Sequence, residues 1–174
     1  MARSDPGRPG QAGADAAWLS RAIELSRCCP RSQSAFSVGA IVVGGDGEVI
    51  ATGFSRERDP RDHAEEVALA RASLAGPSLA GPSLAGPSLA GPALAGATLY
   101  SSLEPCAARA SRPRTCAELI IAAGLRRVVI AWLEPPVFVD GGGAARLRAA
   151  GVTVIEIPEL APAARAVNAH LLAG

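Results

Sequence analysis

Four residues of this chain are of the types that hold and use a catalytic metal ion. His63 and Glu65 are separated by one residue, and Cys106 and Cys116 follow further along the chain. A catalytic zinc keeps three protein ligands and leaves a fourth position open for water, and imidazole and thiolate ligands both suit zinc. The sequence therefore predicts that His63, Cys106 and Cys116 bind one Zn2+. Glu65 is then free to move protons, and it is the predicted catalytic residue.

The elements expected around these residues place them at the starts of helices. Helices are predicted at 63–74, with Asp62 as N-cap, and at 116–123, which opens on Cys116. Helix N-termini are electropositive and favour the thiolate form of cysteine, which is the form that binds zinc. Two such helices lying side by side on one sheet would bring the three ligands to a single ion.

The remaining pattern alternates between strands and helices. Strands are predicted at 37–43, 48–53, 97–101, 127–132 and 152–157, and further helices at 17–27, 144–150 and 159–172. Such alternation predicts an α/β fold in which helices cover a sheet that contains parallel strands. Residues 1–16 are expected to form a disordered N-terminal arm, and 17–174 a single domain.

A low-complexity repeat interrupts this domain at 73–96. The unit Ser-Leu-Ala-Gly-Pro occurs four times in tandem and is followed by one decayed copy. A period of five fits neither helix nor strand, and Gly-Pro breaks both. We expect a flexible surface loop expanded by replication, with a partner-binding extended segment as the alternative.

Composition narrows the possible functions. All seventeen basic residues are Arg, so a Schiff-base lysine and a P-loop lysine are both excluded. The net charge of +1 argues against a strong grip on nucleic acid or on an anionic membrane. No apolar run of 18 residues predicts a transmembrane helix, and residues 1–16 lack the apolar run of a signal peptide, so a cytoplasmic protein is expected. Cys28 and Cys29 are expected to be core or inert thiols, and His170 a surface or packing residue.

Several stretches together resemble the cytidine deaminase superfamily. They are Val38-Gly39-Ala40-Ile41-Val42-Val43, His63-Ala64-Glu65, Ala97-Thr98-Leu99-Tyr100, Leu103-Glu104-Pro105-Cys106, and the run from Cys116 to Val129. Within the superfamily the chain is most similar to the deaminase domain of the bacterial bifunctional riboflavin-biosynthesis enzyme, although nine residues separate the two cysteines here and eight do there. The resemblance implies a cytidine deaminase-like three-layer α/β/α sandwich with a five-stranded mixed sheet, a homo-oligomer (dimer or tetramer), and Zn2+-dependent hydrolytic deamination of an aminopyrimidine.

The substrate remains open between a riboflavin-pathway diaminopyrimidine nucleotide and a deoxycytidylate or cytidine. The segment 34–40 resembles the start of a cytidine deaminase, which favours the second. Arg109 and Arg112 lie between the cysteine ligands and are expected to contact a substrate phosphate, and Ala64 and Pro105 are further expected substrate contacts. Two alternatives from other classes are a tRNA-editing deaminase and a catalytically idle, zinc-stabilised interaction protein.

Overall fold

The computed structural model describes residues 10–75, 94, 96–135 and 142–172. Its centre is one five-stranded sheet with strand order β2-β1-β3-β4-β5. Strands β2, β1 and β3 pair antiparallel, whereas β3, β4 and β5 are parallel. The strands are β1 Gly39–Val43, β2 Val49–Phe54, β3 Thr98–Ser101, β4 Arg127–Ile130 and β5 Thr153–Glu156.

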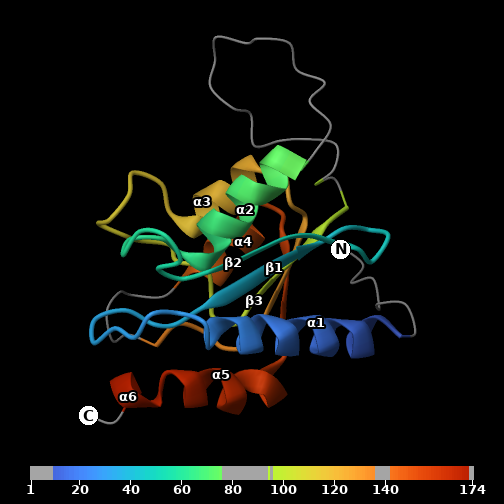
Figure 1. Ribbon diagram of the computed structural model, residues 1–174. Coiled ribbons are helices and arrows are strands. Elements are labelled where there is room, and N and C mark those ends of the chain that lie inside the picture. Colours follow the sequence, from blue (N-terminus) through green and yellow to red (C-terminus); the bar gives the residue numbers. More distant parts are fainter. Residues whose placement is uncertain (1–9, 76–93, 95, 136–141, 173–174) are drawn as a thin grey trace.

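Helices cover both faces of the sheet (Figure 1). One layer holds α2 Ala64–Ala75, α3 Cys116–Ala122 and α4 Gly143–Ala149. The other layer holds α1 Gln11–Ser26, followed near the C-terminus by the short 3-10 helix Pro158–Leu160, α5 Ala161–Val167 and α6 Ala169–Leu172. The predicted α/β fold, a three-layer sandwich with a five-stranded mixed sheet, is therefore confirmed.

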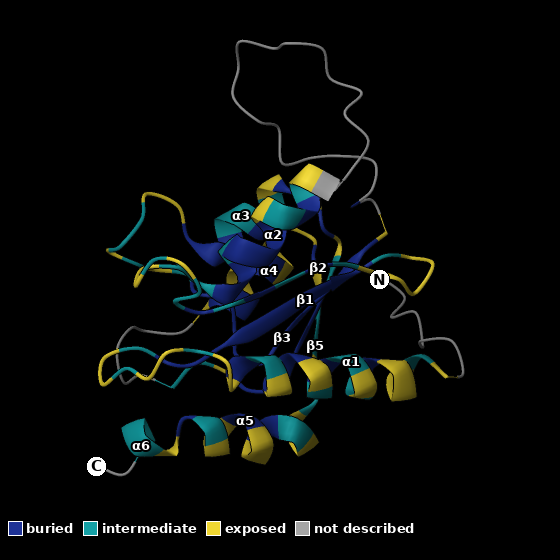
Figure 2. Ribbon diagram, viewed as in Figure 1, coloured by how far each residue is buried: buried dark blue, intermediate teal, exposed yellow. Residues whose placement is uncertain are grey.

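The core lies where the two helix layers meet the middle strands, which are dark blue in Figure 2. All five residues of β1 and all four of β3 are buried. Strands covered on both faces carry continuous apolar runs rather than alternation, and Val-Val-Ile in β4 follows that pattern. Edge strand β2 instead alternates buried residues with more exposed ones along its second half. The middle strands thus form the core of the molecule, and loops follow at their ends.

The first helix begins earlier than predicted. It starts at Gln11, so residues 11–16 belong to the domain, while residues 1–9 of the expected arm lie outside the described residues. Asp15 is buried and accepts hydrogen bonds from the Tyr100 hydroxyl and from both Arg127 terminal nitrogens. These contacts to β3 and β4 hold the first turns of α1 on the sheet. They could not be predicted from any local pattern in the sequence.

The C-terminal helix is not continuous over 159–172 as predicted. It breaks at Asn168, which is 2% exposed. The Asn168 side chain accepts from the N–H of Ser37 at 2.7 Å and donates to the carbonyl of Ser37 at 3.0 Å. An amide that bonds a distant backbone in this way accompanies the end of the regular helix.

The surface loop that was predicted over 73–96 does not include both ends of the repeat. Ser73 lies within α2, and Leu94, in the decayed copy, is 1% exposed in the core. Residues 76–93 and 95, where the surface loop was expected, lie outside the described residues. Among the helices that the structure describes, none has the length and apolar character needed to cross a membrane.

Candidate metal centre

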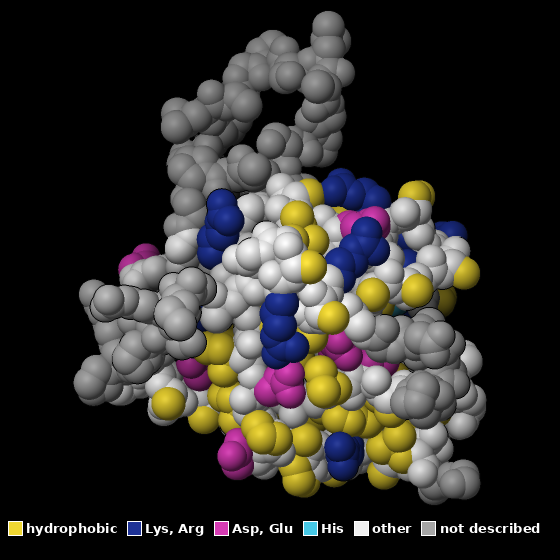
Figure 3. Space-filling model, turned by 180° about the vertical axis from the view of Figure 1, so that it is seen from behind, with side chains coloured by type: hydrophobic (Ala, Val, Ile, Leu, Met, Phe, Trp, Pro, Cys, Tyr) yellow, Lys and Arg dark blue, Asp and Glu magenta, His cyan; other side chains and the backbone are white. Residues whose placement is uncertain are grey.

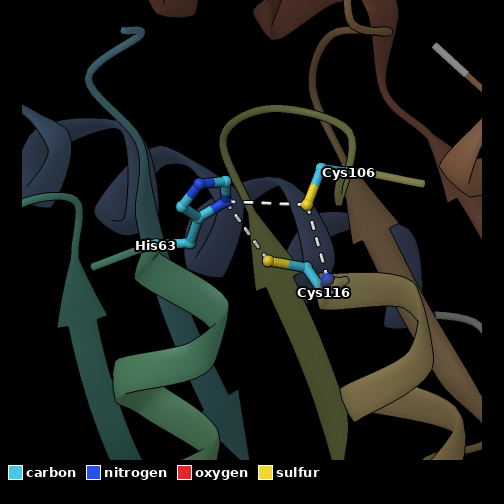
Figure 4. Close-up of side chains that lie close together, drawn as sticks. All are labelled: His63, Cys106 and Cys116. Atoms are coloured by element: carbon cyan, nitrogen blue, oxygen red, sulfur yellow. Dashed lines mark hydrogen bonds between the residues drawn. The ribbon is translucent and has the colours of Figure 1, made fainter. Parts of the chain in front are cut away.

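Three predicted ligands converge at one end of the sheet (Figure 4). His63 directly precedes α2, Cys106 lies in the loop after β3, and Cys116 is the first residue of α3. His63 Nδ1 is 3.6 Å from Cys106 Sγ and 3.4 Å from Cys116 Sγ. All three ligand atoms lie within 4.8 Å of one another. In the part of the chain that the structure describes, this is the one such group.

These distances fit a zinc ion. A tetrahedral zinc with nitrogen at about 2.0 Å and sulfur at about 2.3 Å places those two ligand atoms about 3.5 Å apart. The observed 3.4 and 3.6 Å straddle that value. One imidazole and two thiols also form a donor set that zinc prefers over hard cations such as magnesium. The three residues can therefore hold the metal that the sequence predicts.

A capping box fixes the position of Cys116. Thr115 is the N-cap of α3, and its hydroxyl accepts from the N–H of Glu118, while the Glu118 carboxylate accepts from the N–H of Thr115. The N–H of Cys116 points at Cys106 Sγ over 3.4 Å. The helix N-terminus thus presents one ligand and donates a hydrogen bond to another, which stabilises negative charge on sulfur.

Buried Glu104 fixes the loop that carries Cys106. Its carboxylate accepts from the N–H groups of Glu134, Gly142 and Ala144, so it joins the end of β4 to the start of α4. Gly143 packs so closely on the Pro105 carbonyl that a Cβ there would overlap it. In the sequence, Glu104 is notable only as part of the stretch Leu103-Glu104-Pro105-Cys106. Its role could not be recognised because its partners lie 30 to 40 residues away.

Glu65 lies beside His63, Cys106 and Cys116, which we call the triad, and it is 3% exposed. Its carboxylate accepts a 2.9 Å hydrogen bond from the Ser101 hydroxyl at the end of β3. Burial raises the pKa of Glu65, and the nearby Cys106 sulfur adds to that rise, while His63 opposes it. A carboxyl whose pKa is raised holds a proton more readily, which suits a group that takes up and returns a proton.

The two cysteines differ in their affinity for protons. The hydrogen bond from the Cys116 thiol lowers the pKa of Cys106 to about 4, with His63 also lowering it and burial opposing. The same hydrogen bond, together with burial, raises the pKa of Cys116. Burial lowers the pKa of His63, but the Cys106 hydrogen bond and charge outweigh it, so the net shift is upward. The site thus already favours thiolate at Cys106.

A cavity of about 330 Å³ opens onto His63, Cys106 and Glu65. Its apolar wall includes Phe36, Val38 and Leu103. Glu134 also faces this space, and burial, followed by the charges of Cys106, Glu65 and Glu104, raises its pKa to about 8. An apolar slot with a few polar groups is the usual form of a small-molecule site.

The predicted substrate contacts do not all reach this cavity. Arg109 lines it, with a side chain 3% exposed. Its Nη2 donates to the Arg61 carbonyl and to Glu66, whereas its buried Nη1 has no hydrogen-bond partner. Ala64 and Pro105 are buried beside the ligands but are not part of the cavity wall.

Arg112 is not part of the cavity wall either. Its guanidinium lies within 4 Å of carboxylate oxygens of Asp59, Asp62 and Glu66.

Asp62 is not the N-cap of α2 as predicted. The carbonyl of His63 instead accepts the first helical hydrogen bond, and the Asp62 carboxylate accepts from the N–H of Asp59 and from Arg112.

The remaining thiols and the second histidine lie away from the triad. Cys28 is exposed, and Cys29 approaches the Val38 carbonyl at 3.3 Å. His170 contacts the Ser32 carbonyl at 2.8 Å, which is a packing role.

Comparisons with known proteins agree with this geometry. The family model of the cytidine and deoxycytidylate deaminase zinc-binding region matches residues 13–132. The chain is 36% identical over 139 residues to the diaminohydroxyphosphoribosylamino-pyrimidine deaminase of Schizosaccharomyces pombe, covering 80% of this chain and 31% of that protein. It is 36% identical over 118 residues to riboflavin biosynthesis protein RibD of Aquifex aeolicus, covering 68% of this chain and 27% of that one.

A solved structure shows the same fold. The diaminohydroxyphosphoribosylaminopyrimidine deaminase/5-amino-6-(5-phosphoribosylamino)uracil reductase of Thermotoga maritima superposes with a TM-score of 0.69 at 32% identity, covering 90% of this chain and 40% of that one. The chain spans about 30% of the length of the two curated relatives. With the family model matched across the three ligands and Glu65, the chain belongs to the cytidine and deoxycytidylate deaminase zinc-binding family, whose cofactor is zinc.

Proposed function

We propose that this chain is a zinc-dependent hydrolytic deaminase of an aminopyrimidine, with His63, Cys106 and Cys116 as metal ligands and Glu65 as the catalytic residue. The observation that carries the proposal is the placement of Glu65. It is buried at the edge of the cavity, within reach of the triad, and it is held by Ser101 rather than by a cation. An acid in that position has little purpose in a purely structural zinc site, which is closed.

The chemistry follows from these positions. Zinc bound by the three ligands supplies Lewis-acid activation of a water. Glu65 takes a proton from the attacking water and delivers it to the ring nitrogen, and it then carries the remaining proton from the new hydroxyl on the ring carbon to the departing amine. The ring carbon thereby gains a C=O bond, its C–N bond breaks, and ammonia is released. Ser101 orients the Glu65 carboxyl for both transfers, and the apolar cavity walls exclude bulk water.

The proposed substrate is a phosphorylated aminopyrimidine of the kind that the curated relatives' names describe. Arg109 supports this choice, because the residue lines the cavity and its buried Nη1 has no hydrogen-bond partner. A phosphate oxygen would satisfy that N–H with a charge-assisted hydrogen bond. Contacts of substrate with Arg112, Ala64 and Pro105 remain proposals. The second candidate is a deoxycytidylate or cytidine, favoured by the description of the matched family model.

A substrate screen tests the proposal. Purified protein is incubated with diaminopyrimidine nucleotides, cytosine nucleotides, the matching nucleosides and short RNAs, with and without a chelator, and ammonia is measured. We expect release from a pyrimidine nucleotide that the chelator abolishes. Release from RNA alone would favour the tRNA-editing alternative. A complete absence of release with zinc bound would favour the idle, zinc-stabilised interaction protein.

The surface agrees with a small substrate. On the face drawn in Figure 3, Arg side chains are scattered among acidic ones and do not form a continuous basic field. Non-specific binding of nucleic acid depends on such a field.

We also propose a cytoplasmic homo-oligomer. Light scattering on the purified protein would give its molar mass directly.

A further inference from the structure

One part of the cavity wall is held in shape by side chains from distant parts of the chain. Residues 30–37 connect α1 to β1 without forming a helix or strand, and Ser34, Ala35 and Phe36 within them line the cavity. Several carbonyls of this segment accept hydrogen bonds from elsewhere. Asn168 and His170 meet it from the C-terminal side, and Arg56 meets it from the side of the cavity.

Arg56 makes the larger set of contacts. Its Nε and Nη2 donate to the Pro30 carbonyl at 2.9 and 2.8 Å, and Nη2 also donates to the Ser37 hydroxyl at 3.0 Å. Its Nη1 donates to the carbonyls of Phe36 at 2.9 Å and Ala35 at 3.5 Å. Every nitrogen of this guanidinium is therefore engaged by the segment. This distinguishes Arg56 from Arg109, whose Nη1 lacks a partner.

The backbone of Arg56 has an uncommon conformation. Its φ is 60°, and among the described residues it is the one position other than glycine with a positive φ. Side chains with a Cβ rarely adopt this region, and such outliers persist where the surrounding structure holds them, often at functional sites. A glycine would adopt this backbone without strain. The presence of arginine there is explained by what its guanidinium holds.

The segment in turn fixes an aromatic face. Phe36 packs edge-on against Trp132, and their ring centroids are 5.4 Å apart. Trp132 lies two residues after the end of β4. Because Ser34, Ala35 and Phe36 line the cavity, displacement of the segment would change the space available to a planar ring.

We propose that Arg56 is a positioning residue that holds segment 30–37 against the cavity and thereby sets how tightly the substrate ring binds. This inference rests on the proposed function. Arg56 does not touch the reacting atoms, so its loss affects substrate binding more than turnover.

The test uses Arg56→Gly and Arg56→Lys. The glycine variant suits the backbone but removes all the guanidinium contacts, and the lysine variant keeps the charge but loses the fork geometry. Arg148→Ala is the matched control, because it removes a surface guanidinium that also bonds a backbone carbonyl but does not line the cavity. We expect Arg56→Gly to raise KM at least about tenfold with kcat within about threefold, Arg56→Lys to fall between, and the control to match wild type.

Hydrogen exchange gives a second readout that does not depend on activity. Amides 31–38 should exchange faster in Arg56→Gly than in wild type and the control, while those of β3 and β4 are unchanged. Unaltered exchange at 31–38, or a fall in kcat with KM unchanged, would overturn the positioning role. If wild-type protein deaminates nothing, the proposed function fails. The exchange data then still decide whether Arg56 holds the segment.

Discussion

The Ser101 hydroxyl donates a 2.9 Å hydrogen bond to the Glu65 carboxylate, and this contact joins the end of a central strand to the first turn of α2. Ser101 is fully buried and Glu65 nearly so. The bond is made to one of the two carboxylate oxygens, Oε1. The acid is thereby held by a residue of the buried sheet rather than by a loop.

Two arginines of the loop between the cysteines should differ in their effect on substrate binding. Arg109→Ala removes a guanidinium that lines the cavity and has a buried N–H group without a partner, so KM for a nucleotide should rise at least about tenfold, while KM for the matching nucleoside changes little. The sequence predicts the same for Arg112→Ala. The ion pairs of Arg112 with Asp62 and Glu66 provide a structural alternative. Steady-state kinetics on a nucleotide and its nucleoside separate these roles, and equal effects on both substrates would mark the mutated residue as structural.

The cap of α3 should contribute measurably to stability. Thr115→Ala removes the hydroxyl that accepts from Glu118 N–H, and we expect a loss of about 1 kcal/mol in the free energy of unfolding. Because Cys116 is the next residue, zinc affinity should fall as well. Chemical denaturation and a competitive zinc titration measure the two effects. A variant with unchanged stability would show that the cap contributes nothing.

The same cap should be sensitive to acid. The hydrogen bond from Thr115 N–H holds the pKa of Glu118 below its ordinary 4.5. A lowered folded-state pKa stabilises the fold above the ordinary value, and that contribution is lost as the pH falls through the folded-state pKa. Wild type should therefore exceed Glu118→Gln in stability at pH 7 and converge with it in acid. Parallel denaturation curves across pH 3 to 7 (roughly the range in which such a carboxyl titrates) test this. A gap that does not change with pH would contradict the assignment.

The tandem repeat should be dispensable. Deleting 78–92 removes three whole units and retains Leu94, which is part of the core. Because loop length changes closure entropy by only about 0.6 kcal/mol per doubling, zinc content and activity should persist. The melting temperature should stay within a few degrees. Limited proteolysis of wild type should cut first in the repeat or near the N-terminus. Aggregation or lost activity in the deletion would show that the segment packs on the domain or on a partner.

The convergence of His63, Cys106 and Cys116 was predictable from the sequence because each residue lies at a local boundary. His63 directly precedes a helix, Cys116 opens one, and Cys106 follows a strand, so short-range patterns were sufficient. Contacts over long distances in the chain were not predictable. Glu104 holds backbone 30 to 40 residues away, and Asn168 bonds Ser37 across 131 residues. No periodicity records such pairings.

The roles of the individual arginines were not predictable either, because they depend on contacts between distant parts of the chain. In a chain whose basic residues are all arginine, the sequence could not separate Arg109, which lines the cavity, from Arg112, which lies among carboxylates. It also gave no sign that Arg56 adopts a left-handed backbone conformation.

The metal ligands can be tested apart from activity. Purified wild type and Cys28→Ser should each contain one zinc per chain, while Cys116→Ser and His63→Ala should lose it, because a three-residue site cannot spare a ligand. Elemental analysis after dialysis gives the content. Full zinc in Cys116→Ser, or loss in Cys28→Ser, would reject the assignment.

Ammonia release by Glu65→Gln, measured alongside its zinc content, tests the central claim most directly. The amide keeps the size of the side chain and can still accept from Ser101, but it cannot take up a proton. We predict full zinc, an unchanged melting temperature, and turnover reduced by at least about 10²-fold, the scale of general acid–base catalysis. Zinc-loaded Glu65→Gln that releases ammonia at the wild-type rate would contradict the account.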